Sequence, residues 1–394
     1  MQEQLKETYQ LSTRKSALDF LRKVLQTNFP VAVWRLPGTS SIRALIDLSG
    51  AEGDRNREIE NLDKCFIING YADTHPTNPL VLKGDIILHL NDAKVLMDVS
   101  PTLSAEQFEH FQEKLETTHD IQPTNFTQSV HPDYPGMVSE AVQKIKEGVL
   151  HKVVLSRFED FDLPKSFDAL TTLQNLASRY ENAFCYLINT QTYGCWMGAT
   201  PEKLIALKDN QFFSTDALAG TQTLPEDKDL CDVAWTQKEI EEQAMVSRYI
   251  IDCFKKIRLR EFDEIGPKTV KAGNLTHLKT EFKVDMYATN SPMLGSTMLE
   301  LLHPTSAVCG MPRELADEFI KAHEGYDRSL YAGFLGPVGF EGNTNLFVNL
   351  RCMQVSESKA RLFAGAGITE NSNPQKELEE TGYKMQTLLK VLNA

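Results

Sequence analysis

The stretch HKVVLSR, residues 151–157, is an apolar run bounded by charged side chains, and it is predicted to form a buried strand. Side chains alternate between the two faces of a strand, so Lys152, Val154 and Ser156 share one face. Taken alone, the segment favours a lysine at a sheet edge, with its stem on apolar surface and its ammonium group in water. The alternative is that Lys152 points at a reaction centre.

The segments on either side of this strand predict an α+β fold. Upstream, apolar residues recur at helical spacing from Val138 to Ile145, and Gly148 suits a helix end. Because strands and helices interleave without regular βαβ alternation, this class is favoured over a doubly wound sheet. The polar stretch 118–136 is predicted to be a loop and a possible internal boundary. Further strands are predicted at 30–36, 42–48, 64–70, 85–90, 182–189, 195–200, 203–207, 346–355 and 360–368, and helices at 235–257, 312–323 and 374–392.

The composition is that of a globular protein, since 394 residues of which 41% are hydrophobic can bury a large core. The first residues lack the pattern of a secretory signal, and no run of about 18 apolar residues occurs, so a cytoplasmic protein without membrane contact is expected. The seven cysteines are scattered, which predicts free thiols. The formal charge of -13 argues against nucleic acid as a partner.

The terminal helix carries charged residues on one stripe. Asn373 is expected to cap this helix, and Pro374 suits its first position. Glu377, Glu380 and Lys384 then follow at i, i+3 and i+7. The stripe is either a solvated face with a Glu380–Lys384 pair or part of a site.

The helix at 235–257 offers two more carboxylates. Thr236 and Glu239 have the spacing of a capping box, which explains Glu239 without any function. Glu242 lies one turn further along the same face, and the cap does not explain it. Two helices that aim carboxylates at one point would suit Mg²⁺, which prefers hard oxygen ligands and keeps several waters. On spacing alone, a solvated face is favoured over this metal site.

Nine blocks between Lys152 and the C-terminus carry a resemblance to a known family. They are KVVLSR, GATPEKL, ALAGT, LTHL, HPTSAVCG, YDRSLYAGFLG, NLRC, RLFAGAGI and EETGYKMQTLL. On these blocks the chain resembles the chorismate-utilising enzymes, which include anthranilate synthase component I, and most closely the isochorismate synthases. A lone AGAG would be weak, since glycines often mark only close backbone approach, but nine ordered blocks are specific.

The resemblance implies one large α+β domain over residues 1–394, in which two packed β-sheets are flanked by helices and the active site lies in a cleft between them. Residues 1–115 would be a poorly matched N-terminal part of this fold, and 135–394 the part with the catalytic motifs. The implied reaction is the magnesium-dependent conversion of chorismate to isochorismate, in which water adds at ring C2 while the C4 hydroxyl leaves. The product would feed menaquinone or siderophore biosynthesis.

The resemblance also implies roles for particular residues. Lys152 would be the general base on the attacking water, and Glu202 the general acid that protonates the departing hydroxyl. The implied magnesium ligands and the flanking positions that hold water on the metal are Glu242, Glu380, Glu239 and Glu377. The positions implied to contact the substrate are Gly220, His277, Ala307, Arg351, Gly365 and Lys384.

Acid–base chemistry constrains the surroundings of these residues. An ordinary lysine is almost fully charged at neutral pH, so Lys152 is expected to be desolvated or crowded by positive charge in the substrate-bound site. Glu202 is expected to have a raised pKa, because an ordinary carboxyl would be ionised. Like charges between the substrate carboxylates, Glu242 and Glu380 imply that magnesium and chorismate bind cooperatively.

Relatives with other activities differ at particular positions. Ammonia-using synthases generally carry glutamine in place of Lys152, and aminodeoxychorismate synthases carry a lysine where this chain has Ala219. Threonine is common in those enzymes, and in salicylate synthase, where this chain has Ala307. Water is therefore the expected nucleophile, and a monomer without a glutaminase subunit is expected. Salicylate synthase, which goes on to eliminate pyruvate from isochorismate, is the alternative function.

A remoter alternative is an inactive protein that binds chorismate or metal on a decayed scaffold. Retention of the base, the acid and the metal ligands argues against it. Gln243 replaces a common histidine, Gln222 falls where many relatives have arginine, and residues 224–235 match poorly, so the metal's surroundings depart from the family pattern. Cys309 is expected to be a small buried thiol and not a nucleophile.

Overall fold

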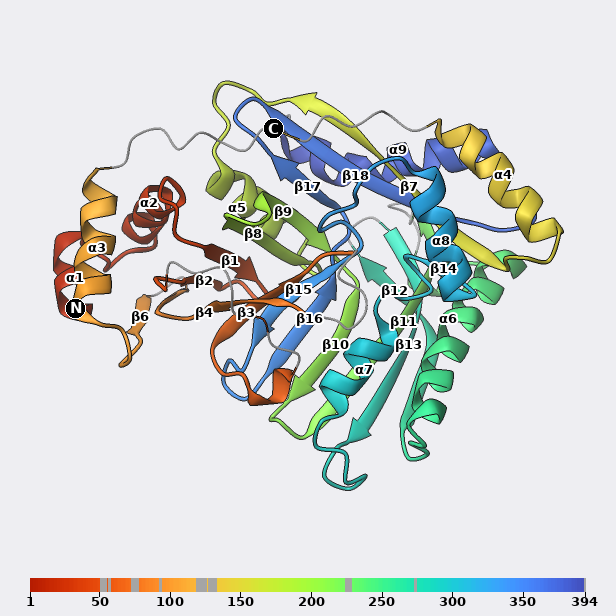
Figure 1. Ribbon diagram of the computed structural model, residues 1–394, viewed down its shortest axis with the longest axis horizontal. Helices are drawn as coiled ribbons and strands as arrows, with labels where there is room; N and C mark the ends of the chain where they lie inside the picture. The colour runs from red at the N-terminus through yellow and green to blue at the C-terminus, as the bar shows by residue number, and fades with distance from the viewer. Residues whose placement is uncertain are drawn as a thin grey trace.

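Two antiparallel β-sheets pack against each other in the computed structural model, with helices around them (Figure 1). The structure describes residues 1–49, 55, 58–71, 78–91, 94–117, 126, 133–223, 229–272 and 275–392. The ten-stranded sheet has the order β14 (Gly310–Met311), β7 (Lys152–Asp162), β18 (Lys359–Ile368), β17 (Cys352–Val355), β9 (Gly194–Thr200), β8 (Phe184–Thr190), β1 (Val31–Arg35), β2 (Ile42–Ile46), β5 (Ile86–Leu90) and β6 (Val95–Val99). The eight-stranded sheet has the order β12 (Asp263–Ala272), β13 (Leu275–Asp285), β11 (Phe212–Thr223), β10 (Lys203–Lys208), β16 (Thr344–Val348), β15 (Phe334–Val338), β3 (Cys65–Asn69) and β4 (Leu80–Lys83).

Helices cover the outer faces of both sheets. One apolar cluster joins the ten-stranded sheet to helices α2, α3, α5 and α9, while α6 packs on β11 and β13 and α7 packs on β10. Helix α4 contacts β7 and α9, and α8 contacts β7 and β14. The described helices are α1 (Gln2–Thr8), α2 (Arg14–Leu25), α3 (Ala105–Glu116), α4 (Tyr134–Lys146), α5 (Ala169–Arg179), α6 (Gln237–Lys256), α7 (Leu294–Leu302), α8 (Arg313–His323) and α9 (Pro374–Leu392), with short 3-10 turns η1 (Ile59–Asn61) and η2 (Leu230–Asp232).

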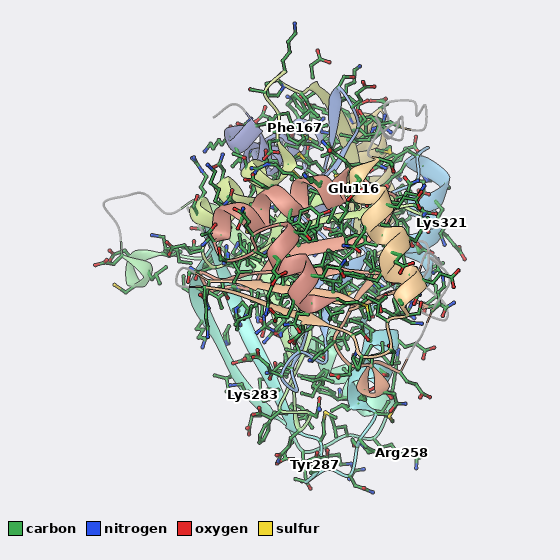
Figure 2. All side chains as sticks on the ribbon, turned by 90° about the vertical axis from the view of Figure 1, so that its left-hand side faces the viewer. Glu116, Phe167, Arg258, Lys283, Tyr287 and Lys321 are labelled. Carbon is green, nitrogen blue, oxygen red and sulfur yellow. The ribbon has the colours of Figure 1, made fainter. Side chains whose placement is uncertain are left out.

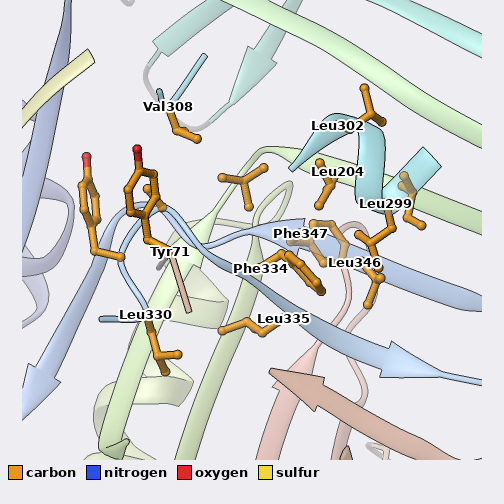
Figure 3. Packing of buried hydrophobic residues seen from close by; sticks show 14 of the residues in the cluster. Tyr71, Leu204, Leu299, Leu302, Val308, Leu330, Phe334, Leu335, Leu346 and Phe347 are labelled. Atoms are coloured by element: carbon orange, nitrogen blue, oxygen red, sulfur yellow. The ribbon is translucent and has the colours of Figure 1, made fainter. Parts of the chain in front are cut away.

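The main core is a cluster of aromatic and branched side chains that joins both sheets and the helices packed on them. Figure 3 shows part of it, including Leu299 and Leu302 of α7 and Leu346 and Phe347 of β16. Phe184 of the ten-stranded sheet stacks on Phe347 of the eight-stranded sheet, with ring centroids 4.3 Å apart. Trp34 and Phe66 also meet across the sheets, with tilted rings whose centroids are 5.2 Å apart. Such contacts between large buried rings hold the two sheets at a fixed separation.

The N-terminal residues take part in both sheets. Strand β1 pairs with β8 in the ten-stranded sheet, and β3 pairs with β15 in the eight-stranded sheet. The poorly matched segment 1–115 therefore contributes strands to the same two sheets as the motif-bearing part of the chain.

The predicted strand 346–355 is wrong as a single element. The structure divides it into β16 and β17, which belong to different sheets. Arg351 has φ of 50°, a left-handed conformation that interrupts a strand. The Asn349 side chain accepts from the Tyr186 hydroxyl at 2.5 Å and donates to Leu330 O at 2.9 Å, which fixes the crossing. The turn was overlooked because apolar residues flank Asn349 and Arg351 on both sides and both halves are buried.

The predicted loop 118–136 is only partly described. Residues 118–125 and 127–132 lie outside the described residues, and its end from Tyr134 is the first turn of α4. Asp133 caps that helix by accepting from the Gly136 N–H, a signal that the loop prediction overlooked.

The surface and the thiols agree with the composition. Charged side chains such as Glu116, Lys283 and Lys321 lie on the outside of the molecule (Figure 2). All seven cysteines are free, as predicted, and Cys309 is buried. None of the helices in the described part of the chain combines the length and apolarity needed to cross a membrane.

Candidate active site

Strand β7 places Lys152 in the interior. Lys152 is only 2% exposed, and its Nζ donates to Glu242 Oε1 at 2.7 Å. The strand pairs with β18 on one side and with β14 on the other. The interpretation of the segment alone, an edge lysine with its ammonium group in water, is therefore wrong, because tertiary packing buries this face of the strand as well.

The start of α6 has the predicted capping box. Thr236 accepts from the Glu239 N–H, and Glu239 Oε2 accepts from the Thr236 N–H at 2.8 Å. Gln222 Nε2 donates to the same Glu239 oxygen at 2.8 Å. Glu242 follows one turn later, where no cap holds it, and reaches Lys152 instead.

Helix α9 presents the second pair of carboxylates. Asn373 caps it as predicted, accepting from the N–H groups of Gln375 and Lys376 at 3.1 Å each. Glu377 is 4% exposed and pairs with Lys238 of α6 at 3.6 Å. Glu380 pairs with Lys384 at 2.7 Å.

A cleft of about 280 Å³ brings these side chains together. Ten of the twelve predicted site residues line it, and the other two, Lys152 and Glu377, pair with the lining residues Glu242 and Lys238. The ten are Glu202, Gly220, Glu239, Glu242, His277, Ala307, Arg351, Gly365, Glu380 and Lys384. The residues that the resemblance selected thus converge on one site from strands and helices far apart in sequence.

Burial changes the acidity of Glu202. Desolvation raises its pKa from 4.5 to about 7, although the positive charges of Lys152, Lys384 and Arg351 act to lower it. The raised pKa agrees with the expectation for a general acid, since about half of the carboxyl groups hold a proton at neutral pH.

Glu242 is shifted in the opposite direction. Burial acts to raise the pKa of Glu242, but the charge and hydrogen bond of Lys152 outweigh it, so the pKa lies below its ordinary value. Two carboxyl groups of one cleft, Glu202 and Glu242, thus favour different protonation states.

His277 is neutral at physiological pH. Burial, followed by the charge of Arg351, lowers its pKa to about 4. Its Nδ1 lies 3.0 Å from Gly220 O and donates to it, because a carbonyl oxygen only accepts. His277 thereby ties β13 to the bend in β11 at Gly220, whose φ is 69°.

The four glutamates predicted at the metal site carry the type of ligand atom that magnesium prefers. Glu239, Glu242, Glu377 and Glu380 offer only hard carboxylate oxygens from two helices that line one cleft. Within the described residues, however, no three of them bring ligand oxygens within 4.8 Å of one another. Among the described residues, the group whose ligand atoms lie that close together is Asp229, Cys231 and Asp232; all three are exposed, and none is a predicted ligand. A magnesium ion here would therefore be coordinated by few protein oxygens, and waters or substrate would supply its other ligands, as is usual for Mg²⁺ in proteins.

Tyr331 and Lys238 are among the cleft residues that the sequence analysis did not predict. Tyr331 lies within the quoted block YDRSLYAGFLG and stacks on Phe363 with centroids 5.6 Å apart. The Tyr331 hydroxyl would lie 2.8 Å from a Cβ atom on residue 365. The glycine at this position was therefore a sequence signal that another group approaches the backbone closely. Lys238 resembles any solvated helix residue in sequence and gave no signal.

Gln243 and Gln222, the two glutamines that depart from the family pattern, form hydrogen bonds that hold α6 in place. Gln243 is 4% exposed, and its Nε2 donates to Ser247 Oγ at 3.0 Å and to Thr280 Oγ1 at 2.6 Å, which fastens α6 to β13. Gln222 Nε2 also donates to Ala234 O at 2.9 Å, so it anchors the start of α6. Of the poorly matched segment 224–235, residues 224–228 lie outside the described residues.

The sequence is similar to known proteins along most of its length. A family model described as chorismate binding enzyme matches residues 80–393. Isochorismate synthase EntC of Escherichia coli (strain K12) is 32% identical over 260 residues, which are 65% of this chain and 66% of EntC, just under two thirds of its length. Isochorismate synthase DhbC of Bacillus subtilis (strain 168) is 29% identical over 303 residues, 73% of each protein.

Solved structures share the predicted α+β fold. MenF, the menaquinone-specific isochorismate synthase from Escherichia coli, has a TM-score of 0.76 at 23% identity, with 96% of this chain and 92% of that chain covered. Anthranilate synthase component I from Streptococcus pneumoniae TIGR4 has a TM-score of 0.68 at 20% identity, with 92% and 90% covered. Because the family model spans most of the sequence, this chain belongs to the chorismate-binding enzymes.

Proposed function

We propose that this protein is an isochorismate synthase that isomerises chorismate by adding water at ring C2 and expelling the C4 hydroxyl. One observation carries the proposal: the buried Lys152 and the Glu202 carboxyl group, whose pKa is about 7, lie at the same cleft as the four glutamates. The named activity of relatives such as EntC and DhbC supports it.

The two acid–base residues divide the proton transfers. Glu202 donates a proton to the C4 oxygen, so that the hydroxyl leaves as water, while Lys152 accepts a proton from the water that attacks C2. Lys152 must first lose its contact with Glu242 and release a proton, because an ammonium group in an ion pair cannot act as a base. The net change moves a hydroxyl and shifts two double bonds, with no redox step.

Glu242 and Glu380 would hold Mg²⁺, with Glu239 and Glu377 at the flanking positions. When bound, the ion supplies the positive charge that lets a substrate carboxylate lie beside these glutamates. The carboxylates are now balanced by lysines, in the pairs Lys152–Glu242, Lys238–Glu377 and Lys384–Glu380. We therefore expect magnesium and chorismate to bind cooperatively. The ion would offset the repulsion between the substrate carboxylates and the glutamates, and the substrate carboxylates would in turn attract the ion.

Positive and small residues complete the substrate site. Arg351 and Lys384 provide local cations in an acidic chain, and Lys384 is aimed by its bond to Gly365 O at 2.8 Å. At Gly365, which lines the cleft, a side chain would meet Leu155 O and the Tyr331 hydroxyl at 2.8 Å, so only a glycine fits without displacing them. Ala307, where ammonia users and salicylate synthase commonly have threonine, favours water as nucleophile and isochorismate as final product.

The proposal is tested by incubating the purified protein with chorismate and magnesium and separating the products by chromatography. Isochorismate without salicylate, and its loss in Lys152→Ala, is the expected result. Salicylate with pyruvate would instead identify a salicylate synthase, and an absence of turnover would identify a binding protein on this scaffold.

A further inference from the structure

The outer edge of β7 is completed by side chains where its partner strand ends. Strand β14 pairs with β7 at only two positions, opposite Lys152 and Val153. The Val154 N–H still bonds to Cys309 O at 2.8 Å. Beyond this point Val154 O accepts from a guanidinium, and the Ser156 N–H donates to a carboxylate, both at 2.7 Å.

These two groups belong to one buried ion pair, Glu324 and Arg328. Each is 2% exposed. Arg328 Nε donates to one Glu324 oxygen at 2.8 Å and Nη2 to the other at 2.5 Å, which is the forked geometry of a strong pair. The remaining Nη1 donates to Val308 O at 2.9 Å.

One guanidinium therefore joins two walls of the cleft. Val154 and Val308 both line it. Val154 lies two residues after Lys152 on the same strand, and Val308 follows Ala307 in the chain. Loss of the Arg328 guanidinium would remove the hydrogen bonds that link the strand carrying the proposed base to the segment that contains Ala307.

The attraction between the two charges alone does not account for a buried pair of this kind. The desolvation of two charges often cancels their attraction, so apolar residues of similar volume would serve packing as well. Apolar residues would, however, leave Val154 O, Val308 O and the Ser156 N–H without these partners in the interior, which is costly. The pair is suited to hold backbone groups in fixed places.

We propose that Glu324 and Arg328 are positioning residues that hold Lys152 of β7 and the segment Ala307–Val308 in register across the cleft. They act through the backbone and do not touch the reacting atoms. This inference rests on the proposed function, because the placement of a base and of a substrate wall matters only if the cleft performs that reaction.

The decisive variant is Arg328→Lys, which keeps the charge but cannot bridge Val154 O, Val308 O and both Glu324 oxygens at once. We expect kcat for isochorismate formation to fall about tenfold or more per folded molecule, with the KM for chorismate within about threefold, because small misplacements near a reaction are costly. Amide exchange across residues 152–158, followed by mass spectrometry without substrate, should become faster.

The matched control is Arg361→Lys. Arg361 makes the same forked contact with a carboxylate, that of Asp160, at 2.8 and 2.9 Å. Asp160, however, lies near the end of β7 away from Lys152 and does not line the cleft. This variant should keep its kcat. If Arg328→Lys and Arg361→Lys lower activity only in proportion to the folded fraction, the pair is merely structural and the proposal fails.

Two further measurements keep the test decisive if Arg328→Lys does not fold. Glu324→Gln retains an oxygen for the Ser156 N–H but loses the charge, and it should show the same loss of kcat at nearly unchanged KM. In the wild type, the Ser156 amide should exchange as slowly as the strand-paired amides of β7, and fast exchange would overturn the proposal. If the wild type forms no isochorismate, the proposed function fails, while the exchange data still decide whether the pair clamps β7.

Discussion

The replacement Glu202→Gln isolates the effect of burying the proposed general acid. The amide has nearly the same shape but does not titrate. In the wild type, the Glu202 pKa is about 7 in the folded protein against an ordinary value of 4.5, because burial disfavours the charged carboxylate. The variant should therefore show how much stability the wild type loses when this carboxyl ionises inside the cleft.

The sign and size of the effect follow from linkage. A raised pKa favours folding while the carboxyl is protonated, and this contribution is lost as pH rises from 4.5 through about 7. The difference of about 2.5 pKa units corresponds to about 3 kcal/mol when ionisation is complete. Between pH 5 and pH 8, the stability of Glu202→Gln relative to wild type should rise by about 2.5 kcal/mol.

Urea unfolding at these two pH values measures the free energy of unfolding of each protein. Glu370→Gln is the matched control, because Glu370 is exposed and its replacement should leave the difference unchanged. In parallel, kcat/KM for chorismate should fall above about pH 7 in the wild type as Glu202 loses its proton. A stability difference between variant and wild type that is the same at pH 5 and pH 8 would refute the reasoning about burial.

Three other replacements test the geometry of the cleft and its helices. A methyl group on Gly367 would lie 2.9 Å from Lys152 Cε, so Gly367→Ala should lower kcat about tenfold or more. The control is Gly382→Ala in α9, where the methyl group would meet Arg157 Nη2 at an ordinary contact distance of 4.0 Å. Glu380→Gln should weaken Mg²⁺ binding about tenfold or more in calorimetry with magnesium alone, and unchanged affinity would remove Glu380 from the ligand set. Asn373→Ala removes the cap of α9 and should cost about 1 kcal/mol in urea unfolding without changing kcat.

Local sequence signals predicted the caps and the individual elements well. The capping box of Thr236 and Glu239 and the cap at Asn373 depend on neighbouring residues, so their spacing was sufficient. The division of 346–355 between two sheets depends instead on the buried partners of Asn349, Tyr186 and Leu330, which are distant in sequence and which periodicity does not reveal. Long-range hydrogen bonds decided this element, and no local pattern contained them.

The candidate site shows the same division. Spacing placed Glu239 and Glu242 on one helix face, but only the resemblance indicated that α6 and α9 meet at a cleft. The expected positive crowding of Lys152 remains a prediction for the substrate-bound site, because its nearest charged partner here is Glu242. The buried Glu324–Arg328 pair could not be found from its i, i+4 spacing, which is also common on solvated helices.

The central claim is that a water molecule from solvent attacks the ring while the original C4 hydroxyl departs. It is tested most directly by converting chorismate in ¹⁸O-labelled water with magnesium present and measuring the mass of the product. The proposed chemistry predicts isochorismate that carries one ¹⁸O atom, and no product from Lys152→Ala. Isochorismate without the label would contradict water attack at C2, and salicylate as the product would contradict the assignment itself.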